Sequence, residues 1–164
     1  EGGNEGNEGN EGGSKYVSVG RYYNIQKSFQ NEVSELSKNH KIILIYPIPE
    51  IGWKFPKKLL SSFPKKLSLM ENYLVPKNYI TTSYQVYKDR TKSSFELLDS
   101  LQNKNIYRIY PHKLFCNTII KNRCVTHDDR NIFYYDNNHP SLKGVEMIND
   151  LIMKKIEKIE LKSN

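Results

Sequence analysis

The chain has 164 residues and a formal net charge of +7, with 25 Lys and Arg against 18 Asp and Glu. This length is enough for one domain with a modest hydrophobic core. The lysines are scattered in pairs and accompany no nucleic-acid-binding motif, so we expect no nucleic-acid partner. No apolar run is long enough to span a bilayer, since the longest, residues 42–46, has the length of a strand.

The first residues, EGGNEGNEGNEGGS, repeat Asn, Glu and Gly and contain no apolar side chain. Such a composition is typical of a flexible, solvated segment. The sequence therefore predicts a flexible segment over residues 1–14 and a folded part over residues 15–164. The chain has no N-terminal Met and no secretory signal, so we expect it to begin inside a longer protein.

Helical and strand-like patterns alternate along the folded part. Apolar residues at helical spacing predict a helix over residues 22–38, and the apolar run KIILIYPIPE at 41–50 predicts a strand buried on both faces. Residues 51–85 contain three prolines and predict a long surface loop with one or two short helical pieces. A second helix is predicted over 86–101, followed by a short strand, NIYRIYP, at 105–111.

The last apolar segment, NIFYYD, reads as a short strand that ends at Asp136. A final helix then follows, with Ser141 as its N-cap. Its apolar stripe consists of Val145, Ile148, Leu151, Ile152, Ile156 and Ile159. The order of these elements predicts an α/β fold with a parallel sheet, in which the loops after the strands gather at one edge, where ligands bind.

An Asp and a His stand three residues apart in the loop before the final helix. Side chains so spaced can meet across a tight turn, where the Asp136 carboxylate accepts the Nδ1–H of His139. The other ring nitrogen is then free to take a proton from a serine hydroxyl. Gly144, in the first turn of the helix, allows close approach to neighbouring backbone. The alternative is that Asp, Asn, His and Pro are here only turn and capping residues.

The chain has two cysteines, Cys116 and Cys124. Their spacing leaves open both a pair of buried thiols and a disulfide that closes a short loop. It does not match a zinc pattern, even with the nearby His112 and His127, which we expect at the surface.

The block YYDNNHPSLKGVEMI resembles the last conserved block of SGNH hydrolases, in which Asp and His precede the C-terminal helix. From the Gly-rich segment onward, the chain resembles the SGNH domain fused to the C-terminus of membrane acyltransferases that O-acetylate surface polysaccharides. Further supporting features are the strand and loop IILIYPIPEIGWKFP, the helix with Tyr87-Lys88-Asp89-Arg90, and the pair of cysteines.

The resemblance implies a three-layer α/β/α sandwich with a mostly parallel sheet, incomplete at the N-terminus. It implies that His139 is the general base and Asp136 its orienting partner, and that Cys116 and Cys124 form a disulfide. It implies no cofactor and no metal. The family's nucleophile belongs to a Gly-Asp-Ser block, which the sequence lacks. We therefore expect the serine to lie upstream of this chain, or to be lost in an inactive relative.

The implied function is O-acetylation of a cell-surface polysaccharide by a Ser-His-Asp mechanism. The implied partners are an acyl donor, the polysaccharide acceptor and a membrane acyltransferase domain in the same polypeptide. The implied location is the periplasmic or extracytoplasmic face, tethered to the membrane. The alternatives are a non-catalytic carbohydrate-interaction module and a basic domain that binds anionic surfaces. We expect Trp53 to anchor its loop, Glu50 to be non-catalytic and Arg90 to form an ion pair.

Overall fold

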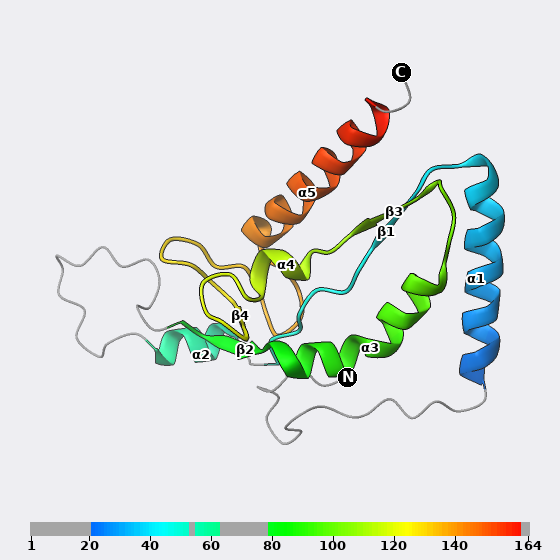
Figure 1. Ribbon diagram of the computed structural model, residues 1–164. Helices are drawn as coiled ribbons and strands as arrows, with labels where there is room; N and C mark the ends of the chain where they lie inside the picture. Colours follow the sequence, from blue (N-terminus) through cyan, green and yellow to red (C-terminus); the bar gives the residue numbers. More distant parts are fainter. Residues whose placement is uncertain (1–20, 53–54, 63–78, 162–164) are drawn as a thin grey trace.

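The computed structural model describes residues 21–52, 55–62 and 79–161 (Figure 1). The flexible segment expected over 1–14, the anchoring role expected for Trp53 and the middle of the surface loop expected over 51–85 lie outside these residues.

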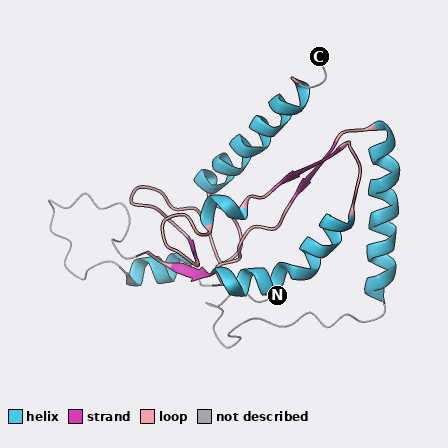
Figure 2. Ribbon diagram, viewed as in Figure 1, coloured by secondary structure: helices cyan, strands magenta, loops and turns pink. Residues whose placement is uncertain are grey.

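Helices and strands alternate along the described residues (Figure 2). In chain order they are α1 (Arg21–Asn39), β1 (Ile42–Ile45), α2 (Phe55–Ser61), β2 (Thr81–Ser83), α3 (Tyr84–Ser100), β3 (Ile106–Ile109), α4 (His112–Phe115), β4 (Arg123–Val125) and α5 (Leu142–Glu160). The predicted helices are confirmed as α1, α3 and α5, and the predicted strands at 41–50 and 105–111 contain β1 and β3.

Strands β1 and β3 pair in parallel, with Ile42 opposite Ile106 and Ile45 opposite Ile109. Strands β2 and β4 form a separate antiparallel pair. Helices α1 and α3 lie on one side of the β1–β3 pair and α5 on the other (Figure 1). The α/β class is therefore confirmed, with a small sheet that carries helices on both sides.

The prediction that the first strand is buried on both faces is wrong for one residue. Leu44 is buried against the α1 and α3 side, whereas Ile45 is 49% exposed. Alternate residues of a strand point to opposite faces, so Ile45 points to the side that carries α5. It stays exposed because α5 packs against β3, the neighbouring strand.

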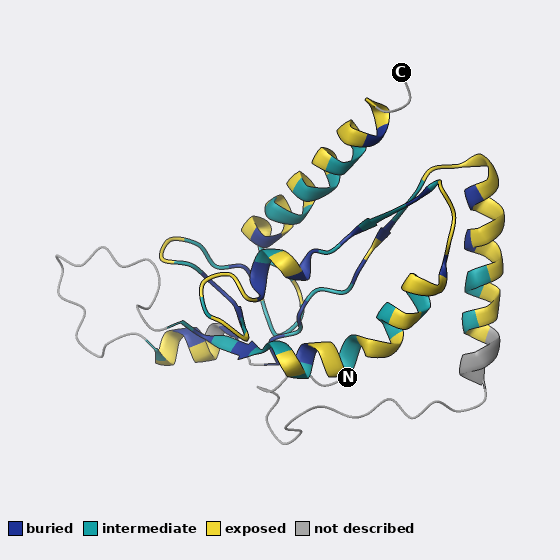
Figure 3. Ribbon diagram, in the orientation of Figure 1, coloured by how far each residue is buried: buried dark blue, intermediate teal, exposed yellow. Residues whose placement is uncertain are grey.

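Among the described residues, buried apolar side chains form two clusters. Figure 3 shows where buried residues lie along the ribbon. The first joins α1, the end of α3 and the β1–β3 pair, through Val33, Leu44, Tyr46, Leu101 and Ile106. The second lies beside the loop before α5 and consists of Ile51, Phe55, Leu59, Ile80, Phe115, Val125, Phe133 and Tyr134. The predicted surface loop over 51–85 is thus wrong at its two ends, because four of its residues belong to this second cluster.

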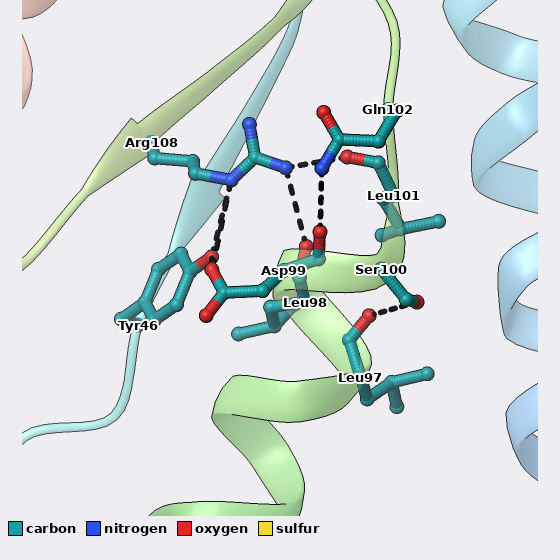
Figure 4. A network of polar contacts seen from close by, with 8 residues as sticks. All are labelled: Tyr46, Leu97, Leu98, Asp99, Ser100, Leu101, Gln102 and Arg108. Carbon is teal, nitrogen blue, oxygen red and sulfur yellow. Dashed lines mark hydrogen bonds and ion pairs between the residues drawn. The ribbon is translucent and has the colours of Figure 1, made fainter.

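A polar network closes the sheet against the end of α3 (Figure 4). The Tyr46 hydroxyl donates to Asp99 Oδ1 at 2.5 Å, and Arg108 Nε donates to the Tyr46 oxygen at 3.2 Å. Arg108 Nη2 also donates to the carbonyls of Leu98 and Leu101, at the C-terminus of α3. A cation is favourable there because the last carbonyls of a helix carry partial negative charge. Burial, and then the Asp99 carboxylate, raise the pKa of Tyr46, which keeps it a hydrogen-bond donor.

Cys116 and Cys124 form a disulfide, with the two sulfurs 2.03 Å apart. Cys124 lies in β4 and Cys116 follows α4, and both are buried. The bond therefore ties α4 to the antiparallel pair, as the resemblance implied.

Candidate active site

The segment from Phe133 to Ser141 folds back on itself. The N–H of Tyr135 donates to the carbonyl of His139 at 2.8 Å, and the N–H of Ser141 donates to the carbonyl of Phe133 at 2.9 Å. The strand predicted before Asp136 is therefore absent as a regular strand, and isolated bridges take its place. The reason is that its backbone hydrogen bonds are divided between two partners: the N–H of Phe133 donates to the carbonyl of Thr126 at 2.8 Å, whereas Tyr135 bonds within its own turn.

Asp136 and His139 meet inside this turn. Asp136 Oδ1 accepts the backbone N–H groups of Asn138 at 3.0 Å and of His139 at 2.8 Å. Its other oxygen, Oδ2, lies 2.8 Å from Nδ1 of His139. The predicted contact is present, and it is held by the carboxylate binding the backbone and the imidazole of the same turn.

The charges at this contact follow from its hydrogen bonds. Partial burial raises the pKa of the Asp136 carboxyl, but the amides of Asn138 and His139 and the His139 imidazole together lower it below its ordinary value. Asp136 is thus an ionised acceptor at neutral pH, which assigns the proton of neutral His139 to Nδ1. The His139 side chain is 71% exposed, and its Nε2 makes no hydrogen bond within the described part of the chain. This nitrogen is available to a reactant.

Gly144 brings the start of α5 against the turn. A Cβ at this position would lie 2.3 Å from the carbonyl oxygen of Phe133, closer than any side chain tolerates. The Ser141 hydroxyl accepts the N–H of Gly144 at 3.1 Å and donates to the carbonyl of Ile132 at 2.5 Å. The expected close approach at Gly144 is confirmed, and only glycine fits there without displacing backbone.

The loop after β1 contacts the same turn. The N–H groups of Ile51 and Gly52 donate to the carbonyl of Asn137 at 2.9 and 3.2 Å. The buried Tyr134 hydroxyl donates to the carbonyl of Pro49 at 2.7 Å. Gly52 has a φ of 74°, a conformation that favours glycine. Sequence reasoning missed these contacts, although a tyrosine in an apolar segment signals a hydroxyl in need of a partner.

The predicted ion pair of Arg90 is confirmed. Arg90 Nη2 lies 3.2 Å from Glu50 Oε2, and the Arg90 side chain is only 15% exposed. The pair joins α3 to the loop after β1, next to the residues that bind Asn137. Glu50 is therefore engaged by a cation, which suits the non-catalytic role that we expected for it.

The expectation that His112 and His127 lie at the surface is wrong, since both are buried. His127 is fully buried, with Nε2 accepting the N–H of Ile80 at 3.0 Å and Nδ1 lying 3.0 Å from the carbonyl of Asp128. Both ring nitrogens have partners in the fold, which gives this residue a structural role.

His112 is buried among aromatic rings, and its Nδ1 has no hydrogen-bond partner among the described residues. The surrounding rings are those of Tyr84, Tyr87, Phe95 and Tyr110. Burial, and then the charge of Lys113, lower the pKa of His112 to about 4. It is therefore neutral at physiological pH. The expectation that His112 is exposed rested on its position beside the cysteine loop, and the sequence pattern does not indicate the rings that surround it.

Among the described residues, no three His, Cys, Asp or Glu side chains are grouped so that they could hold a metal ion. In the same part of the chain, no helix combines the length and apolar character needed to cross a membrane.

Comparison with known families matches residues 3–154 to the family described as "SGNH domain (fused to AT3 domains)". Comparison with curated proteins and comparison with solved structures gave no match. The match covers most of the chain and includes the Asp136–His139 turn, the loop after β1 and both cysteines. The chain therefore belongs to the family of SGNH domains that are fused to AT3 domains.

Proposed function

We propose that this domain is part of an acyltransferase that O-acetylates a cell-surface polysaccharide, with His139 as general base and Asp136 as its orienting partner. The observation that carries the proposal is the 2.8 Å contact between His139 Nδ1 and Asp136 Oδ2, beside an exposed Nε2. It is the arrangement that a serine hydrolase uses to activate its nucleophile. Membership of a family fused to AT3 domains supports a membrane acyltransferase domain as partner.

The sequence holds no Gly-Asp-Ser block, so in this proposal the serine comes from a part of the protein outside these residues. His139 Nε2 takes the proton of the serine hydroxyl while its oxygen attacks the acyl carbonyl of the donor. The imidazolium then protonates the leaving group as an acyl-enzyme forms. A sugar hydroxyl next gives its proton to Nε2 while its oxygen attacks the acyl group. The imidazolium returns this proton to the serine oxygen as the bond between serine and the acyl group breaks, which releases the ester and the free serine. Asp136 stays ionised throughout and stabilises the imidazolium.

We place the domain on the periplasmic or extracytoplasmic face, tethered through the AT3 domain. The Cys116–Cys124 disulfide supports this, because disulfides persist in oxidising compartments and are rare in the cytosol. The acyl donor and the polysaccharide acceptor reach the domain from that side.

The decisive experiment uses the full-length protein and measures acetyl transfer to its polysaccharide. We expect His139→Ala to lower turnover by about 10²–10⁴-fold, because general-base catalysis is lost. His40→Ala removes an exposed histidine just after α1 and is the matched control, with turnover unchanged. Unchanged turnover in His139→Ala would instead favour the non-catalytic carbohydrate-interaction module.

A second experiment needs only this chain. In the neutral imidazole of His139, ¹⁵N NMR should find the proton on Nδ1, because Asp136 accepts it. Asp136→Ala removes the acceptor and should shift the proton toward Nε2, whereas the signals of the buried His127 should not change. A proton on Nε2 in the unmodified chain would contradict the assignment.

The chain alone should not hydrolyse p-nitrophenyl acetate, because the expected serine is not among its residues. If the chain does hydrolyse this ester, and His139→Ala abolishes the hydrolysis, the nucleophile lies within these residues.

A further inference from the structure

A groove lies between the C-terminal half of α5 and the segment from β3 to α4. It consists of two adjoining cavities of about 340 and 280 Å³, which share Lys155 and Lys158 in their walls. The first also has Lys113 and Lys154 in its wall, and the second extends toward the end of α5. The two cavities therefore form one elongated hollow along the helix.

This groove has a strong excess of positive charge. Four lysines line it, Lys113, Lys154, Lys155 and Lys158, and neither cavity has an Asp or Glu in its wall. None of the four forms an ion pair with another described residue. Elsewhere on α5 the situation differs, since Lys143 pairs with Glu146 at 3.1 Å. The lysines of the groove thus carry charge that the fold leaves unneutralised.

Arg108 also borders the groove, but its charge is used elsewhere. It lies opposite Leu44 in the register, so its side chain points to the α1 and α3 face. Figure 4 shows its guanidinium in the network with Tyr46 and Asp99. The positive charge of the groove therefore comes from the four lysines.

The groove also has aromatic and apolar walls. Tyr110 lies in the first cavity and Tyr107 in the second. The ammonium of Lys113 lies 4.8 Å from the ring centre of Tyr110, and that of Lys155 lies 6.0 Å from the ring centre of Tyr107. Tyrosine rings combine an apolar face with a polar hydroxyl, which suits them to contact sugar rings. Charge and aromatic surface are thus combined along the same hollow.

We propose that this groove binds an acidic polysaccharide, a sugar chain that carries carboxylates. This rests on the proposed function and deepens it, because it makes the acceptor an anionic polymer. Helix α5 begins directly after the Asp136–His139 turn, and at 1.5 Å per residue Lys154 and Lys158 lie about 18 and 24 Å along it from Leu142. A polymer held in the groove is long enough to reach the turn, whereas a single sugar is not.

The shape of the site favours a polymer over a membrane. A lipid surface is flat and meets the most protruding side chains, whereas these lysines surround a hollow with tyrosines in its walls. An elongated cleft fits a chain with repeated charges. The test below includes phospholipid vesicles, so that binding to lipid headgroups can be told apart from binding to the polymer.

The test measures binding of this chain to polygalacturonate and to neutral dextran by calorimetry at low salt. We expect binding to polygalacturonate alone, weakened by added salt because screening reduces the attraction. The double variant Lys154→Ala/Lys158→Ala should bind about fivefold to tenfold more weakly, from two lost charge contacts. Lys104→Ala/Lys121→Ala is the matched control, since it removes the same charge from exposed positions outside the groove, and its affinity should change less than about twofold.

Three results would overturn the proposal. Equal losses in the two double variants would show that net charge, and not the groove, attracts the polymer. Equally tight, lysine-dependent binding of single-stranded DNA would show a site for any polyanion. The third result is a chain that does not bind polygalacturonate but binds phosphatidylglycerol vesicles, with the vesicle binding lost in Lys154→Ala/Lys158→Ala. It would show that the groove contacts a membrane.

The proposed function and the proposed binding of polysaccharide in the groove can be refuted separately. His139→Ala should lower acetyl transfer by about 10²–10⁴-fold and leave polygalacturonate binding unchanged. If turnover survives that substitution, the proposed function fails while the binding result stands. If turnover is lost as expected but polygalacturonate does not bind the groove, the groove proposal alone fails.

Discussion

Replacing Gly144 with Ala tests how the start of α5 is held against the candidate active site. The added Cβ would lie 2.3 Å from the Phe133 carbonyl oxygen and 3.2 Å from Cβ of Pro140, where ordinary contacts are 3.4–4 Å. The close neighbour is backbone and cannot rotate away. The helix or the turn must therefore move by about 1 Å, and Phe133 O also accepts the N–H of Ser141.

Two opposing effects decide the magnitude. Ala in place of Gly inside a helix gains about 1 kcal/mol from backbone entropy. The forced displacement costs about 1–3 kcal/mol as overpacking, and a weakened Ser141–Phe133 hydrogen bond costs about a further 1 kcal/mol. We therefore expect Gly144→Ala to lower the free energy of unfolding by about 2 kcal/mol.

Urea unfolding followed by circular dichroism measures this difference. Asn149→Ala, at an exposed position of the same helix, is the matched control and should be neutral or stabilising by about 0.5 kcal/mol. The His139 ¹⁵N signals should also shift in Gly144→Ala, because the turn moves with the helix. A Gly144→Ala variant as stable as the unmodified chain would refute the close approach of α5 to the turn.

Three further predictions concern the buried groups. Folding lowers the pKa of His112 from 6.5 to about 4. As the pH drops from about 6.5 to about 4, the unfolded chain therefore binds a proton at this residue before the folded chain does. The free energy of unfolding should fall over this range by up to about 3 kcal/mol. Urea midpoints across this range should lose that part of their pH dependence in His112→Phe. The Cys116–Cys124 disulfide has a sequence separation of 8, so its reduction should lower the free energy of unfolding by about 2.5 kcal/mol, measured by urea unfolding. The control is the variant with Ala at both positions, whose free energy of unfolding should not change when reductant is added. Tyr134→Phe leaves the Pro49 carbonyl without its 2.7 Å donor and should cost about 1–2 kcal/mol in the same assay.

The regular elements could be predicted because their signals are local. Helical spacing identified α1, α3 and α5. The N-cap of α5 follows from Ser141, whose hydroxyl accepts the N–H of Gly144 three residues along the chain. The contact of Asp136 with His139 is local in the same sense. Each depends on residues within one or two turns of backbone, so the sequence pattern contains most of the information.

What the sequence did not predict depends on partners far away in the chain. Ile45 is exposed because α5 packs on the neighbouring strand, and no property of the run KIILIY indicates this. His127 is buried because it accepts a hydrogen bond from Ile80, 47 residues away. His112 is buried because α3 brings the rings of Tyr84, Tyr87 and Phe95 against it. Position beside a loop was therefore a poor guide to the exposure of either histidine.

Local and distant contacts have different effects on the candidate site. The orientation of His139 is set within its own turn, by an Asp136 carboxylate that binds two backbone amides and the imidazole. The distant supports, Tyr134 to Pro49 and Asn137 to the loop after β1, act on the turn as a whole and not on the imidazole. Changes in that loop should therefore lower stability, or displace the turn, while the proton of His139 stays on Nδ1. A substitution in the loop that moved this proton to Nε2 would show that the orientation of the base depends on the fold around it, and that the turn alone is insufficient.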